Sequence, residues 1–119
     1  MYIVKFYRTP RGECPVIDFI EELDKKTRAK IYRYLALLQE YGPNLPRPYA
    51  DHVKGKIKEL RVKTSVGGIR ILYFFFIRHN VIMLHAFKKK TQKLPEREIR
   101  KAERNMDDFV VRYERDEFR

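Results

Sequence analysis

The stretch IKELRVKTSVGGIRILYFFFIRHNVIMLHAFKKKTQK, residues 57 to 93, decides the fold, because it holds three runs with the composition of β-strands. Residues 69 to 77 are apolar at both odd and even positions, which point to opposite faces of a strand, except at Arg70. An apolar run of this length, rich in β-branched and aromatic residues, is typical of a strand that is covered on both faces. The pattern therefore predicts a central strand at residues 69 to 77.

Two further strand patterns flank the central one at short range. Residues 57 to 62 precede it across Gly67 and Gly68, and residues 81 to 87 follow it across residues 78 to 80. Connections this short favour antiparallel neighbours. We therefore expect a curved antiparallel meander.

The first half of the chain is expected to supply one strand and two helices. Residues 2 to 7 alternate like an outer strand. Apolar residues at helical spacing predict helices at residues 15 to 24 and 25 to 41, which form a helical hairpin. Residues 42 to 56 contain three prolines and no sustained period, so we expect a loop there.

A third helix is expected to begin at Pro95, which suits the first helical position. Its apolar stripe needs a sheet face to cover. At 119 residues the chain is long enough for one domain, residues 1 to 119. The expected fold is α+β, with a mainly antiparallel sheet of about four strands packed by the helical hairpin and the C-terminal helix.

The charge of the chain is strongly positive and unevenly distributed. The sequence has 27 Lys and Arg against 16 Asp and Glu, a net charge of +11. Residues 51 to 104 hold 15 basic and 5 acidic residues, a net charge of +10. Basic charge concentrated in one half, with aromatic residues between, indicates a polyanionic partner such as nucleic acid. A solvated basic surface is the alternative.

Cysteine usage and hydropathy exclude several protein classes. Cys14 is the one cysteine, so an internal disulfide is excluded. The sequence has no Cys or Cys/His spacing typical of a metal site, and we expect no metal and no cofactor. No apolar run approaches 18 residues, and the N-terminus alternates in polarity unlike a signal peptide. We expect a cytoplasmic protein that does not bind membranes.

The run LHAFKKKTQKLPEREI, residues 84 to 99, resembles the HigB-like, phage-derived branch of the RelE/ParE toxin superfamily. ELR at residues 59 to 61, RILYF at residues 70 to 74 and residues 12 to 19 extend the resemblance over most of the chain. It implies a RelE-like domain that is the toxin of a type II toxin–antitoxin pair. Such a toxin enters the ribosomal A site and cleaves mRNA there. Its cognate antitoxin, expected here to be a helix-turn-helix protein encoded next to it, keeps it inactive.

Arg70 is the first candidate for catalysis. RNA can be cut if its 2′-hydroxyl is aligned with the scissile phosphate, a base acts, and cations stabilise the developing charge. A guanidinium in an apolar strand is costly unless it lies at a sheet edge or faces a wet cleft. The resemblance implies that Arg70 contacts the scissile phosphate. The alternative is a strand-end arginine paired with Glu59 or Asp51. Arg61 is a candidate for the same reason, although the alternative is an exposed arginine at the end of a strand.

Lys89 and Lys90 match the paired basic positions that precede the family's threonine. Successive strand residues point to opposite faces, so only one of the two shares a face with Phe87 unless the strand has already ended. Either could be a phosphate clamp or a general acid or base. Met83, His85 and Phe87 are alternate residues, so they are expected on one face of the strand. His85 is a candidate proton carrier. A packed strand histidine is the alternative.

Other basic and aromatic residues are candidates for RNA binding. Lysines can follow the phosphate backbone, and aromatic rings can stack on a splayed base. For Tyr73, core packing is the alternative. The RNA-binding candidates are Lys54, Lys56, Lys58, Lys63, Lys88, Lys93, Phe87 and Tyr73.

The general base and the exact activity stay open at this point. Some RelE relatives have a tyrosine early in the last helix as a candidate base, whereas residues 96 to 100 here include none. Two other functions are compatible with the sequence: a non-catalytic, ParE-like inhibitor of DNA gyrase and a basic RNA-binding module. The candidate cations favour the endonuclease, because phosphate cleavage needs converging positive charge.

Overall fold

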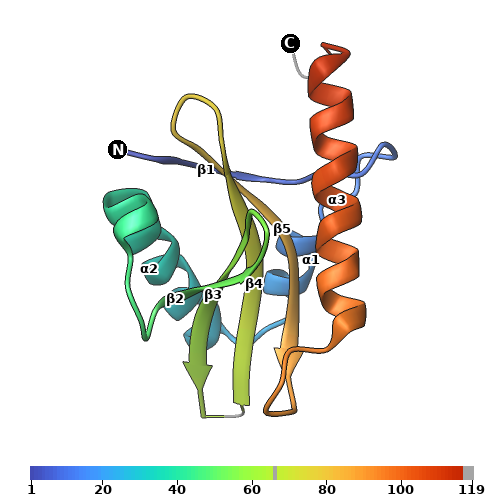
Figure 1. Ribbon diagram of the computed structural model, residues 1–119. Helices are drawn as coiled ribbons and strands as arrows, with labels where there is room; N and C mark the ends of the chain where they lie inside the picture. The colour runs from blue at the N-terminus through green and yellow to red at the C-terminus, as the bar shows by residue number, and fades with distance from the viewer. Residues whose placement is uncertain (66, 117–119) are drawn as a thin grey trace.

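Figure 1 shows the computed structural model of the chain, which describes residues 1 to 65 and 67 to 116. Within these residues five strands form one mixed sheet in the order β1-β5-β4-β3-β2. Helices α1 and α2 lie on one face and α3 lies on the other. The elements are β1 (Ile3–Phe6), α1 (Pro15–Glu21), α2 (Lys25–Tyr41), a 3₁₀ turn (Gly42–Asn44), β2 (Ala50–Lys54), β3 (Ile57–Thr64), β4 (Gly67–Phe76), β5 (Asn80–Lys89) and α3 (Glu96–Glu114).

The central strand is β4, as the sequence predicts. Ile71 and Tyr73 pack with α1 and α2 in one core cluster, whereas Leu72 and Phe74 pack with α3 in the other. Because successive side chains of a strand point to opposite faces, β4 needs apolar residues on both parities. Its pairing with β3 and β5 is antiparallel, which confirms the predicted meander.

The two edges of the sheet are occupied by short strands. β1 pairs with β5 in parallel, so the chain's first strand is an outer one, as expected. β2 pairs with β3 in antiparallel fashion, with Ala50 opposite Leu60. The expected loop at residues 42 to 56 is therefore wrong over residues 50 to 54, and the sheet has a fifth strand. Pairing with β3 organises a segment whose own pattern is too short to indicate a strand.

The helical hairpin packs against the sheet through a regular apolar stripe. Asp24 caps α2 by accepting a hydrogen bond from the Thr27 N–H at 3.2 Å. Ile31, Leu35 and Leu38 are buried against the sheet. Gly42 ends the helix with a φ of 55°, and a Cβ there would lie only 2.2 Å from the Tyr2 ring. A glycine at this position therefore allows the N-terminal segment to pack against the end of α2.

The C-terminal helix is fixed to the start of the chain by a polar contact. Tyr7 Oη donates a 2.6 Å hydrogen bond to Asp108, which also accepts one from Arg112 Nε at 3.0 Å. Burial, followed by the contact with Asp108, raises the pKa of Tyr7 to about 12. The predicted apolar stripe of α3 packs on the sheet through Ala102, Met106, Phe109 and Val110, and Ile99 of the same helix is buried. No helix within the described ranges could span a membrane.

Candidate functional site

A β-bulge in β5 decides which side chains share a face with Arg70. Leu72 pairs with His85, but the next residue of β4, Tyr73, pairs with Met83, so Leu84 is an extra residue. Asn105 of α3 donates a 2.9 Å hydrogen bond to the Leu84 carbonyl. The bulge puts His85 on the α3 face, whereas Met83 packs on the other face. The prediction that His85 and Met83 lie on the same face of the sheet is therefore wrong.

Beyond the bulge, one row of paired residues crosses three strands. Arg61 of β3 pairs with Arg70 of β4, which pairs with Phe87 of β5. Phe87 packs in the core cluster beneath α3, so this row lies on the α3 face. Side chains paired across antiparallel strands lie about 5 Å apart on the same face. The sheet thereby brings the two candidate arginines together.

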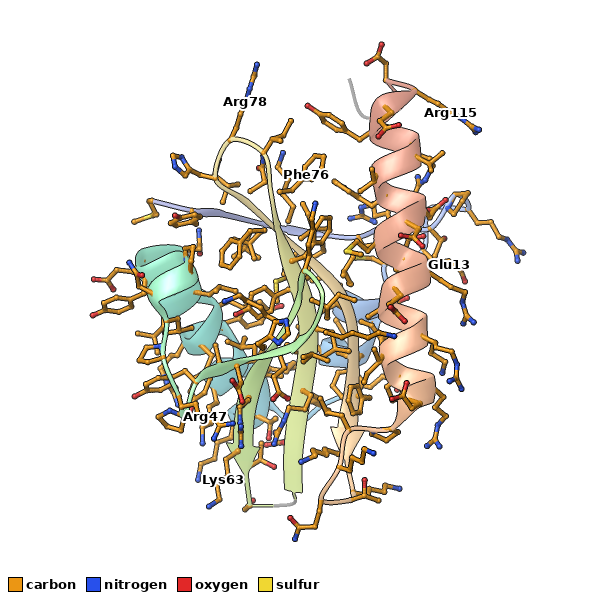
Figure 2. The ribbon with its side chains drawn as sticks, viewed as in Figure 1. Glu13, Arg47, Lys63, Phe76, Arg78 and Arg115 are labelled. Carbon is orange, nitrogen blue, oxygen red and sulfur yellow. The ribbon has the colours of Figure 1, made fainter. Side chains whose placement is uncertain are left out.

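The next row adds two lysines at the end of the sheet. Lys63, Gly68 and Lys89 are paired across β3, β4 and β5. A Cβ on Gly68 would lie 3.1 Å from Arg70 Nη1, so the guanidinium lies over the glycine, between the two lysine positions. Lys63 is at the opposite end of the sheet from Arg78 (Figure 2). We call Arg61, Lys63, Arg70 and Lys89 the cationic patch.

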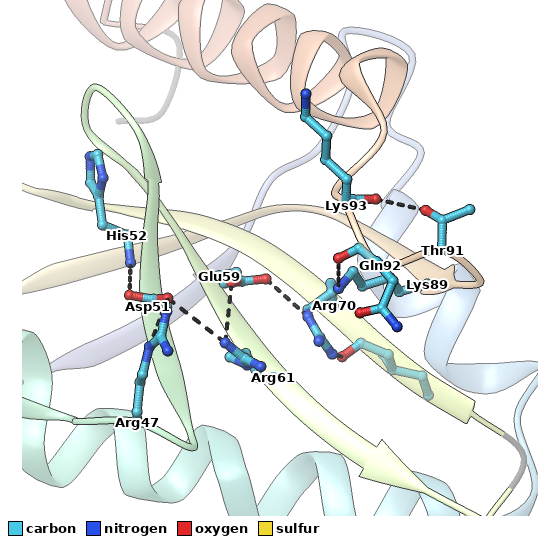
Figure 3. A network of polar contacts seen from close by, with 11 residues as sticks. Arg47, Asp51, His52, Glu59, Arg61, Arg70, Lys89, Thr91, Gln92 and Lys93 are labelled. Atoms are coloured by element: carbon cyan, nitrogen blue, oxygen red, sulfur yellow. Dashed lines mark hydrogen bonds and ion pairs between the residues drawn. The ribbon is translucent and has the colours of Figure 1, made fainter.

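Carboxylates accompany the arginines of the cationic patch. Arg70 Nε lies 2.9 Å from Glu59 Oε1, and the two side chains are only 11% and 8% exposed. Arg61 Nη1 lies 3.9 Å from Glu59 and 3.7 Å from Asp51, which gives the line of alternating charges in Figure 3. Burial lowers the pKa of Arg70, and Glu59 partly offsets this. The structure thus shows the pairing with Glu59 that the sequence left as an alternative.

Asp51 of β2 is itself held by residues close to it in the sequence. It accepts hydrogen bonds from Arg47 Nε and from the His52 N–H, each 2.9 Å long. The hydrogen bond from Arg47 is the main reason why the pKa of Asp51 is lowered, and Arg61 contributes. Asp51 pairs with Glu59 in the sheet register, so both carboxylates lie on the α3 face.

The two candidate lysines of the KKT run differ in position. Lys89 is the last residue of β5, shares the face of Arg70, and donates a 2.8 Å hydrogen bond to the Gln92 carbonyl. Lys90 follows the end of the strand and is exposed. It lines a pocket of about 690 Å³ together with Phe87, Lys93 and the first turn of α3. Lys89 belongs to the cationic patch, and Lys90 lies beside it.

His85 is a packed residue with one strong polar contact. Its Nε2 lies 2.7 Å from Glu98 Oε1, and its ring stacks on Phe87 with centroids 5.8 Å apart. Burial lowers the pKa of His85, as do the nearby Lys101 and Arg104, whereas Glu98 opposes the shift. With a proton on Nε2, neutral His85 donates this hydrogen bond to Glu98. This matches the packed alternative, and a catalytic role for His85 stays a prediction.

Tyr73 and Lys58 lie on the wrong face to join the cationic patch. Tyr73 is 1% exposed and packs edge-to-face on Phe75 in the core beneath α1 and α2. Burial raises its pKa. The prediction that Tyr73 stacks on RNA is therefore wrong in this structure, because its ring does not reach the surface. Lys58 pairs with Tyr73, and its Nζ lies 5.9 Å from the Phe75 ring centroid.

The remaining candidate lysines are dispersed. Lys54 forms an ion pair of 3.4 Å with Glu103, and Lys56 lies in the β2–β3 turn, at the other end of β3 from Lys63. Lys88 pairs with Ile69, and so lies on the face covered by the helical hairpin, near the connection between α1 and α2. Lys93 lies near the cationic patch, in the loop before α3.

Within residues 1 to 65 and 67 to 116, no group of three or more His, Cys, Asp or Glu side chains could hold a metal ion.

The family model described as Phage derived protein Gp49-like (DUF891) matches residues 18 to 107. The chain belongs to this family. The Gp49-like family is part of the HigB/RelE-like toxin group, which confirms the resemblance noted in the sequence. The match includes the whole cationic patch of this Gp49-like protein. No curated protein sequence matches the chain.

Proposed function

We propose that this Gp49-like protein is the toxin of a type II toxin–antitoxin pair and cleaves mRNA on the ribosome. The observation that carries the proposal is the convergence of Arg61, Arg70 and Lys89 on one face, within two adjacent rows of the sheet. Converging cations stabilise the charge that develops on a phosphate during cleavage. A gyrase inhibitor without chemistry does not need this arrangement.

In the proposed reaction the 2′-hydroxyl loses its proton as its oxygen bonds to the adjacent phosphorus. The bond to the 5′-oxygen of the next nucleotide breaks and that oxygen takes up a proton, which leaves a 2′,3′-cyclic phosphate and a 5′-hydroxyl. Arg70 binds the non-bridging phosphate oxygens, and Arg61 adds positive charge from the neighbouring strand. Lys89 extends the charge toward the loop before α3. We assign no proton transfer to His85, because its Nε2 is engaged with Glu98.

The RNA on either side of the cut is proposed to follow the exposed cations at this end of the sheet. Lys90, Lys93 and Arg97 line the 690 Å³ pocket next to the cationic patch. Lysine and arginine side chains at such a position bind phosphates through charge, without reading sequence. Phe87 is only 6% exposed, so little of its ring is accessible to a base.

The ribosome is proposed to supply the alignment that the free protein lacks. Holding a nucleophile in line accounts for a large part of many enzymatic rate enhancements. We therefore expect the purified protein to cut an mRNA in the A site of a programmed ribosome and to leave the same naked mRNA almost intact. A primer-extension comparison of the two substrates tests this. Equal cleavage rates would contradict ribosome dependence, and no cleavage of either substrate would contradict the endonuclease.

The antitoxin is proposed to be the product of a neighbouring helix-turn-helix gene. Co-expression of that product should restore growth and co-purify with the toxin. A neighbour that neither binds nor restores growth would exclude it as the antitoxin.

A further inference from the structure

Glu59 is a buried carboxylate inside the cationic patch. Its Oε1 faces Arg70 Nε at 2.9 Å, and Oε2 faces Arg61 at 3.9 Å. In the part of the chain that the structure describes, neither Oε1 of Glu59 nor Nε of Arg70 has a hydrogen-bond partner with good geometry. Both atoms therefore depend on this one electrostatic contact.

A carboxylate at position 59 hinders the proposed cleavage reaction unless it also has a favourable effect on that reaction. Its negative charge weakens the attraction of the cationic patch for a phosphate. Burying a carboxylate also costs stability unless a cation compensates for it. Phosphate binding alone would be better served by a neutral residue at position 59. The contact with Arg70 is the feature that can offset both costs.

The geometry of the contact shows what it does to Arg70. A guanidinium is a planar group with five N–H donors, and one of them is on Nε. Because Glu59 lies beside Nε, its negative charge holds that part of the guanidinium by electrostatic attraction and not by a directed hydrogen bond. Nη1 lies over Gly68 and donates a 3.3 Å hydrogen bond to the Ile69 carbonyl. Each terminal nitrogen carries two N–H groups, so the guanidinium has further donors for a phosphate.

We propose that Glu59 is a positioning residue, which holds the Arg70 guanidinium in the orientation that receives the scissile phosphate. The inference rests on the proposed function, since it concerns the same reaction. Glu59 does not touch the RNA in this account and acts only through Arg70. The competing explanation is that Glu59 merely balances charge in the folded protein.

The two explanations predict different cleavage rates for Glu59→Gln. A positioning role predicts a rate of cleavage about 10- to 100-fold lower, because a small misplacement of a catalytic group has effects of this size. The half-saturating concentration of programmed ribosomes should stay unchanged or fall, since a negative charge has been removed. Charge balance alone predicts tighter binding with an unchanged rate.

Two further variants separate contact from charge. Glu59→Asp keeps the charge but draws the carboxylate back by about 1.5 Å, the length of one C–C bond. It should lose rate as Glu59→Gln does. Glu40→Gln makes the same change of net charge at an exposed position on α2, and should cut like the parent.

The test combines single-turnover cleavage on programmed ribosomes with nitrogen-15 NMR of the Arg70 side chain. We expect the Arg70 Nε–H to exchange slowly with water in the parent and in Glu40→Gln, and faster in both Glu59 variants. A folded Glu59→Asp or Glu59→Gln protein that cuts at the parent rate would overturn the inference. So would a rate loss that only follows the loss of folded protein, with Nε–H exchange unchanged. A parent protein that cuts no mRNA on ribosomes would instead overturn the proposed function.

Discussion

Replacing Arg70 by alanine should destroy cleavage and also weaken the fold, for two separable reasons. The substitution leaves the carboxylate of Glu59, a side chain that is 8% exposed, without its 2.9 Å partner. Breaking a buried pair in this way typically costs about 3 to 5 kcal/mol. For a chain of this size that corresponds to a fall in melting temperature of roughly 10 to 20 °C. Arg61 Nη1, 3.9 Å from Glu59 Oε2, is the other cationic group next to this carboxylate.

The double variant Glu59→Gln/Arg70→Ala separates stability from catalysis. Removing the stranded charge should recover most of the lost melting temperature, because the neutral amide is far cheaper to bury. Cleavage should not recover. Loss of a charge-stabilising donor typically lowers the rate by about 100- to 1,000-fold.

Thermal unfolding and single-turnover cleavage on programmed ribosomes complete a double-mutant cycle. The double variant should cut as slowly as Arg70→Ala, because Glu59 acts through Arg70. Glu40→Gln serves as the control for net charge. A stable double variant that cuts within about tenfold of the parent would refute the role of Arg70, since the expected loss is at least about 100-fold.

Three further outcomes follow from the structure. Lys89→Ala should lower the cleavage rate more than Lys90→Ala, because only Lys89 shares the face of Arg70. Single-turnover rates at saturating ribosomes check this, and a larger loss of rate for Lys90→Ala would contradict the assignment. The pKa of His85 is lower in the folded chain than in the unfolded chain, so below about pH 6.5 the unfolded chain binds a proton there more readily. His85 therefore stabilises the fold above that pH, and this contribution is lost as the pH falls. Melting temperatures between pH 7.5 and 5 should therefore fall more for the parent than for His85→Gln, and parallel curves would refute this. Expression in cells should stop methionine incorporation before thymidine incorporation, whereas the reverse order would indicate gyrase as the target.

The strands and helices were predictable wherever the residue pattern repeats along a segment. Residues 69 to 77 are apolar at odd and even positions except at Arg70, and such a run, rich in β-branched and aromatic residues, is typical of a strand between two layers. β2 was missed because Ala50–Lys54 is short, follows three prolines and is ordered by pairing with β3. Its register also brings Asp51 beside Glu59, which no local pattern indicates.

The site was predictable in its residue types but not in its geometry. The β-bulge at Leu84 reverses the parity of every later residue in β5, and it puts Lys89 on the α3 face in place of Lys88. No glycine marks the bulge, and the side chain that holds its carbonyl is Asn105, 21 residues away. Glu98, which binds His85 from α3, was likewise out of reach of a sequence pattern.

The central claim is that the cationic patch cuts mRNA in the ribosomal A site. Mapping the 5′ ends of mRNA in cells, shortly after expression of the parent or of Glu59→Gln/Arg70→Ala, tests it most directly. The account predicts new 5′ ends inside translated reading frames, in a fixed relation to the codon in the A site, for the parent only. An unchanged pattern of 5′ ends in growth-arrested cells that express the parent, or the same new ends with the folded double variant, would contradict it.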